Sequence, residues 1–132
     1  MFWCFHCYAV NDHPSGPCRA CGKPVEAPTG LSYHGRLIWA LRHPDGDRAV
    51  VAAQTLGRLK ARESVPALRE AVEAGPDILL RAEALRSLIV IEGVEPLRPW
   101  LEALSRDAPF NVRAIAQDAL AGRLSGDVRP DP

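Results

Sequence analysis

Two closely spaced cysteine pairs carry the clearest chemical signal in this sequence. Cys4 and Cys7 form one Cys-x-x-Cys pair, and Cys18 and Cys21 form a second one ten residues later, which accounts for all four cysteines of the 132-residue chain. Each pair places two thiolates on one tight turn, and two such turns supply the four soft ligands of a structural Zn²⁺. We therefore predict one structural Zn²⁺ bound by these four cysteines. A closed four-thiolate site has no open position for water or substrate, which argues against metal catalysis.

Disulfide bonds, a redox dithiol and a mixed ligand set are the alternatives for these cysteines. Disulfide frameworks belong to secreted chains, and the first residues lack the basic region and apolar run of a signal peptide. A redox pair would open a helix after a strand, whereas the residues between the two pairs are turn-forming types. His6 and His13 could each replace one thiolate. We keep zinc as the prediction, and with it a reducing compartment, the cytoplasm.

The first 25 residues resemble a known family of zinc fingers. Trp3, Asn11 and Gly22, together with the cysteine spacing, are similar to the finger named after the Ran-binding nucleoporin. Members of that family bind ubiquitin or single-stranded RNA. The chain carries Tyr8-Ala9 where ubiquitin-binding members carry Thr-Phe, and it lacks the arginines of RNA-binding members. The resemblance thus implies a metal-bound hairpin, for which a generic zinc ribbon would serve as well, and it implies neither ligand.

Charge and hydropathy set limits on the partners. Sixteen basic and sixteen acidic residues give a formal net charge of zero, so nothing draws the whole chain toward nucleic acid or a membrane surface. No apolar run approaches the roughly 20 residues that a membrane-spanning helix needs. We therefore expect no membrane association.

Beyond the cysteines the chain is helical and repeats itself. Two prolines and a glycine in residues 24–30 predict a linker, after which apolar residues recur at helical spacing. Ala52, Ala84 and Ala116 lie 32 residues apart, as do Leu56, Leu88 and Leu120, which indicates a helix pair present three times. We predict an all-α short solenoid of three helix pairs (about 31–60, 63–91 and 94–124) preceded by a small hairpin. The expected parts are a zinc module over 1–28, repeats over 29–124 and a flexible tail over 125–132.

These helix pairs look like HEAT repeats of the short bacterial kind that is also found in phycobilin lyases. The resemblance is carried by residues 37–45 for the first helix of a pair and 52–59 for the second. It implies stacked pairs with an extended binding surface. We expect Asp47 to cap the second helix, and Arg81 and Arg113 to bond loop carboxylates such as Asp77 and Asp107. We also expect the zinc module to dock on the first pair through its aromatic residues.

No catalytic set stands out in the sequence, so we predict a protein that is not an enzyme. The predicted function is a protein–protein interaction adaptor, and the alternative is a nucleic-acid- or ribosome-associated protein that uses aromatic residues of the finger. A lyase-type enzyme related to phycobilin lyases ranks third, because it would rest on fold alone. The partner-binding residues would lie on exposed positions of the second helices: Gln54, Arg58, Glu83, Arg86, Ser87, Gln117 and Asp118.

Overall fold

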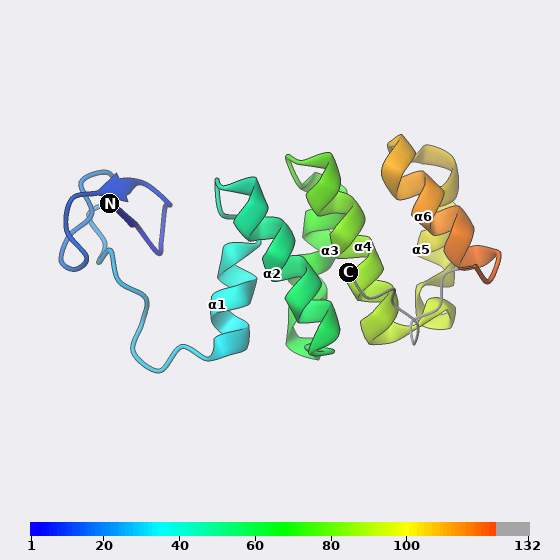
Figure 1. The fold of residues 1–132 in the computed structure, drawn as a ribbon, viewed down its shortest axis with the longest axis horizontal. Helices are drawn as coiled ribbons and strands as arrows, with labels where there is room; N and C mark the ends of the chain where they lie inside the picture. Colours follow the sequence, from blue (N-terminus) through cyan, green and yellow to red (C-terminus); the bar gives the residue numbers. More distant parts are fainter. Residues whose placement is uncertain (124–132) are drawn as a thin grey trace.

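The computed structural model describes residues 1–123, in which a small cysteine module precedes a stack of helices (Figure 1). This cysteine module contains an antiparallel pair of short strands, β1 (Phe2–Trp3) and β2 (Val10–Asn11), with Phe2 opposite Asn11. The helices are α1 (Tyr33–Ala40), α2 (Gly46–Arg58), α3 (Val65–Ala74), α4 (Ile78–Glu92), α5 (Val94–Asp107) and α6 (Phe110–Leu120). The expected tail, residues 125–132, lies outside the described part of the chain.

The helices pack as three consecutive pairs, as the repeat spacing predicted. The first helix of each pair (A helices α1, α3 and α5) packs against the second (B helices α2, α4 and α6). The B helices also pack on one another, α2 on α4 and α4 on α6, which joins the pairs into a row (Figure 1). One helix pair cannot bury its apolar side alone, so stacking is what completes the core.

A continuous apolar core runs through the row of helices. The periodic leucines Leu56 and Leu88 are completely buried, and so are Ala53, Ala84 and Ala116. Alanines at these positions leave room for neighbouring B helices to approach closely. The central helix α4 carries buried residues around most of its circumference because it packs against α2, α3 and α6.

Aspartates just before the B helices fix where two of these helices begin. Asp45 accepts a hydrogen bond from the backbone N–H of Asp47 at 3.0 Å, and Asp77 accepts one from Leu79 at 2.8 Å. Each carboxylate satisfies an otherwise unpaired donor of the first turn. The N-cap of α2 is therefore Asp45, and the expectation for Asp47 was wrong. Asp47 lies inside the first turn, where its negative charge still suits the helix dipole.

Arg81 caps the C-terminal end of the preceding A helix, α3. Its Nε donates to the carbonyl of Val72 at 2.8 Å, and its Nη2 donates to the carbonyl of Glu73 at 3.3 Å. The last carbonyls of a helix lack partners within it, and a guanidinium can satisfy two of them at once. The predicted bond to a loop carboxylate is thus replaced by bonds to carbonyls. Arg113, at the equivalent position in α6, lies over the ring of Phe110.

No helix within residues 1–123 combines the length and the apolar character needed to cross a bilayer.

Candidate metal centre

The two cysteine pairs form two turns of the same backbone geometry. The carbonyl of Cys4 accepts a hydrogen bond from the N–H of Tyr8 at 2.9 Å, and the carbonyl of Cys18 accepts one from Gly22 at 3.0 Å. Tyr8 and Gly22 occupy equivalent positions and both have positive φ, 65° and 77°. The turn therefore requires a left-handed residue after each pair, which glycine supplies without strain in the second turn.

The four sulfur atoms converge on one point. All four Sγ atoms lie within 4.8 Å of one another, with 3.8 Å between Cys4 and Cys21 and 3.6 Å between Cys7 and Cys18. A tetrahedral ion with metal–sulfur bonds of about 2.3 Å has edges of about 3.8 Å between its ligands. The four cysteines are free thiols in this structure. The donor set and its spacing therefore fit a metal ion bound by four thiolates.

Hydrogen bonds and crowding act differently on the thiols. Backbone hydrogen bonds from Cys21 and Ala20, together with the Asn11 amide, lower the pKa of Cys18 to about 5. A backbone hydrogen bond at Ala9 lowers the pKa of Cys7, but desolvation and the neighbouring thiols outweigh it and raise that pKa to about 12. The neighbouring thiols thus oppose ionisation of Cys7. A bound cation would favour the thiolate forms of the ligands.

Asn11 ties the two turns together from a buried position. Its side-chain amide donates to the carbonyl of Ala9 at 3.1 Å and to the Sγ of Cys18 at 3.4 Å, and its oxygen accepts from the N–H of Arg19 at 2.9 Å. Only 1% of Asn11 is exposed. Donors outside the ligand set orient the ligands of a metal site and hold their charge. Asn11 is the polar residue that could do so here.

The predicted linker begins later than expected. Val25 is buried beside Cys4 and Cys18. It also exchanges backbone hydrogen bonds with the module, accepting from Phe5 at 2.8 Å and donating to Gly16 at 2.9 Å. Residues 24 and 25 therefore pack with the cysteine module.

Aromatic rings join the module to the first helix. The indole of Trp39 on α1 stacks against the ring of Phe5, with centroids 5.5 Å apart, and against Tyr8 at 4.9 Å. The indole N–H donates to the carbonyl of Phe5, and the Tyr8 hydroxyl donates to the carbonyl of Trp39. Stacking and reciprocal hydrogen bonds make this a specific contact rather than a loose approach. Two other aromatic residues of the module and of α1, Phe2 and Tyr33, are 40% and 62% exposed.

His43, just after α1, completes the junction and was missed in the sequence. Its ring meets those of Trp3, Trp39 and Tyr8 at centroid distances of 4.6, 5.4 and 5.8 Å. A histidine in the turn after a helix is commonly exposed to solvent. In the sequence, only the aromatic residues near the cysteines indicated that a turn close to the module would be buried.

An open groove of about 870 Å³ follows the junction. Its lining includes Phe5, Tyr8 and Trp39 at the junction and Ala71, Ala74 and Leu80 from the second pair. An ion pair at this groove joins Arg42, which follows α1, to Glu70 on α3. The lining of the groove is mainly apolar, and it also includes His43 and Asp77.

All seven predicted partner-binding residues lie on the B helices, and all except Ser87 are at least partly exposed. Arg58 and Gln117 are exposed, whereas Gln54, Glu83, Arg86 and Asp118 are half-buried. Gln117 donates to the carbonyl of Ser105, and Asp118 accepts two hydrogen bonds from Arg123.

Ser87 is the exception and is fully buried. Its hydroxyl donates to the carbonyl of Ala53 at 2.6 Å, which links α4 to α2. Its prediction as a surface residue was wrong, because this small hydroxyl finds its partner on the neighbouring helix inside the core.

Comparison with known proteins identifies the repeats. The model of a family described as HEAT repeats matches residues 36–121. No curated protein and no solved structure matches the chain. The family match does not extend to the Ran-binding finger or to the lyase-like subtype suggested by the sequence. The match covers more than half of the chain and coincides with the stacked helix pairs, so the chain belongs to the HEAT-repeat family.

Proposed function

We propose that this protein is a non-catalytic protein–protein adaptor of the cytoplasm, in which a zinc-bound cysteine module caps a three-pair HEAT stack. The observation that carries the proposal is the exposed side of α2, α4 and α6, which we call the B-helix face. The three helices pack on one another in a row there, so their exposed sides form one extended face (Figure 1). Surfaces of this kind are what stacked repeats commonly offer to protein partners.

Zn²⁺ is the ion we propose for the cluster of Cys4, Cys7, Cys18 and Cys21. Thiolates favour soft or borderline ions, and four of them with near-tetrahedral spacing suit Zn²⁺. When bound, the ion supplies a charge that holds both turns closed, and with them the aromatic surface that meets Trp39. Elemental analysis of protein purified from its native host should give one zinc per chain. A different metal, or no metal, would contradict this assignment.

The contact between the module and the first helix pair argues against the nucleic-acid alternative. That alternative requires aromatic rings of the module that are free to stack on bases. Trp3, Phe5 and Tyr8 instead contact Trp39 or His43. We therefore place the partner on the helices rather than on the finger.

Position-specific photo-crosslinking in the native host tests the adaptor proposal. A photoreactive amino acid at Gln54 on α2 or at Gln117 on α6 should cross-link a protein that mass spectrometry identifies. The same amino acid at Arg36 on α1 or at Glu102 on α5, both exposed on A helices, serves as the control. Absence of protein cross-links from the B helices, or equal cross-linking from the A helices, would refute the adaptor proposal.

A further inference from the structure

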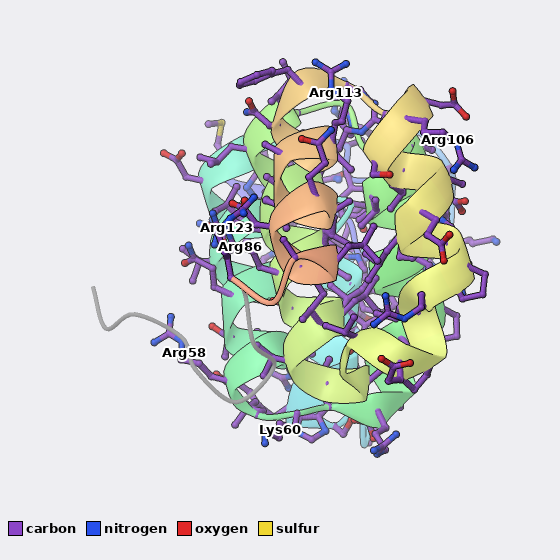
Figure 2. The ribbon with its side chains drawn as sticks, turned by 90° about the vertical axis from the view of Figure 1, so that its right-hand side faces the viewer. Arg58, Lys60, Arg86, Arg106, Arg113 and Arg123 are labelled. Atoms are coloured by element: carbon purple, nitrogen blue, oxygen red, sulfur yellow. The ribbon has the colours of Figure 1, made fainter. Side chains whose placement is uncertain are left out.

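Basic side chains gather along one side of the B-helix face. Arg58 lies at the end of α2, Lys60 follows it, Arg86 lies in the middle of α4, and Arg123 follows α6. We call these four residues the basic stripe. Figure 2 shows Arg58, Arg86 and Arg123 projecting from the same side of the molecule, while Arg106 of α5 points away on the other side. A chain without net charge therefore carries a local excess of positive charge here.

Most of these cations have no carboxylate partner. Within residues 1–123, Arg58, Lys60 and Arg86 make no ion pair, whereas Arg123 binds Asp118 at 2.8 Å. Some arginines elsewhere in the structure are paired, such as Arg98 with Glu95 and Arg48 with Asp45. The stripe thus retains unused guanidinium groups. A guanidinium binds a carboxylate through two parallel hydrogen bonds, which makes it well suited to an acidic partner.

Apolar side chains accompany the stripe. Val51 on α2 and Leu79 at the start of α4 are 55% and 53% exposed, and Leu59 is 44% exposed. Arginines beside exposed aliphatic groups are typical of protein interfaces, where arginine supplies anchors and the apolar groups exclude water. A nucleic acid would gain nothing from these aliphatic groups.

We propose that the basic stripe binds a segment of the partner protein that combines carboxylates with apolar side chains. This inference rests on the proposed adaptor function and adds the chemistry of the partner. The carboxylates would pair with Arg58 and Arg86, and the apolar side chains would cover Val51 and Leu79.

Fluorescence anisotropy with defined probes tests this chemistry on the full-length, metal-bound protein. The probes are a short labelled peptide of alternating glutamate and leucine, the same peptide with lysine in place of glutamate, and single-stranded oligodeoxythymidine. The acidic peptide should bind most tightly, and its affinity should fall as salt is added, because exposed ion pairs are screened.

Paired charge reversals locate the binding site. The Arg58→Glu/Arg86→Glu variant should raise the Kd of the acidic peptide at least about tenfold. The Arg36→Glu/Arg106→Glu variant makes the same change in net charge on exposed positions of the A helices, and it should change the Kd less than about twofold. Circular dichroism checks that each variant is folded. If a reversal does not fold, the Arg58→Gln/Arg86→Gln variant replaces it, with the expected loss in the same direction.

The outcomes separate this inference from the adaptor proposal. Selective loss in the B-helix variant supports the stripe. Equal losses in both double variants would show a general charge effect and overturn it, and tighter binding of the oligonucleotide would reassign the stripe to nucleic acid. Failure of the acidic peptide to bind, while Gln54 still cross-links a protein, would overturn the acidic chemistry and leave the adaptor proposal intact.

Discussion

Tyr8 contacts the helices from the module, although its own backbone conformation is strained. Its φ of 65° lies in the left-handed region, where a residue other than glycine carries about 1–3 kcal/mol of strain. Gly22 holds the equivalent position without strain. Tyrosine at position 8 brings a ring that stacks on Trp39 and a hydroxyl that reaches the Trp39 carbonyl. The strain is offset by a contact that glycine could not make.

Replacing Tyr8 with phenylalanine tests the hydroxyl alone. The Tyr8→Phe variant keeps the ring and the backbone strain, and it should lower the free energy of unfolding by about 0.5–1.5 kcal/mol. Tyr33→Phe removes a hydroxyl from a 62% exposed tyrosine on α1 and should have almost no effect. Urea titration followed by circular dichroism measures both. Equal stability of the Tyr8→Phe variant and the parent protein would show that the hydroxyl does not hold the module in place.

His43 is held in its neutral form at the junction. Only 5% of the residue is exposed, and its Nδ1 accepts the N–H of Asp45 at 3.0 Å. Its Nε2 is buried without a hydrogen-bond partner among the described residues. Burial lowers the pKa of His43, the nearby charge of Arg48 lowers it further, and Asp45 opposes this in part. Protonation would place a charge among aromatic rings and break the bond from Asp45.

The sign of the pH dependence follows from this lowered pKa. As the pH falls through about 6.5, His43 of the unfolded chain takes up a proton, whereas His43 of the folded chain does so only at lower pH. The free energy of unfolding therefore decreases as the pH falls between these two pKa values. We expect the zinc-saturated protein to lose stability as the pH falls below about 7. The His43→Gln variant should lose less over the same range. A slope that His43→Gln leaves unchanged would assign the effect to other groups.

The sequence predicted which segments form helices better than it predicted where those helices begin and end. The 32-residue recurrence of alanine and leucine predicted the pairs, because the same packing position recurs in each repeat. Asp45 and Asp47 are both good capping residues, and only the backbone shows which one accepts the first-turn N–H. Ser87 could not be placed from periodicity, because its burial depends on the Ala53 carbonyl of a neighbouring helix.

Gly93 sets the sharp connection between α4 and α5. Its φ of 83° and ψ of 172° lie in a region that glycine alone occupies readily, and a side chain there would meet nothing within 4 Å. The Gly93→Ala variant should therefore lose about 1–3 kcal/mol through the backbone alone. Glu92→Ala, one residue earlier, should change stability by less than about 0.5 kcal/mol. Chemical denaturation of the two variants decides the point, and a Gly93→Ala protein as stable as the parent would show that the connection can relax.

The candidate metal site could be predicted because it is local in sequence. Cysteine spacing within each pair specifies the turn and the ligands, and the described structure brings all four together. The junction is different: Tyr8 and Trp39 are 31 residues apart, and Phe5 and Trp39 are 34 apart. The sequence predicted that aromatic residues would dock on the first pair. It could not select His43 over Tyr33, because that choice depends on how the module is oriented on α1.

The cysteine module acts as the end cap of the stack. The terminal pairs of a repeat protein must cover an apolar side that an inner pair would hide. At the N-terminal end that cover comes from Trp3, Phe5 and Tyr8, which contact Trp39 and His43. The module itself buries few apolar residues within the described chain, mainly Val25 beside the cysteines. Its shape, and therefore the cap, should depend on the metal.

Metal removal should therefore destabilise the helices as well as the module. Exposing two aromatic residues that are buried in this contact should lower the free energy of unfolding by about 3–6 kcal/mol, judged from the apolar area involved. Such a loss should lower the Tm of the helical signal by at least about 5 °C. Circular dichroism at the helical wavelength, before and after treatment with a chelator, measures this shift. Restoring excess Zn²⁺ should restore the Tm, and Trp39→Ala in the metal-bound protein should lower it in the same way. A helical transition that stays at the same temperature without metal would mean that the module and the stack are thermodynamically independent.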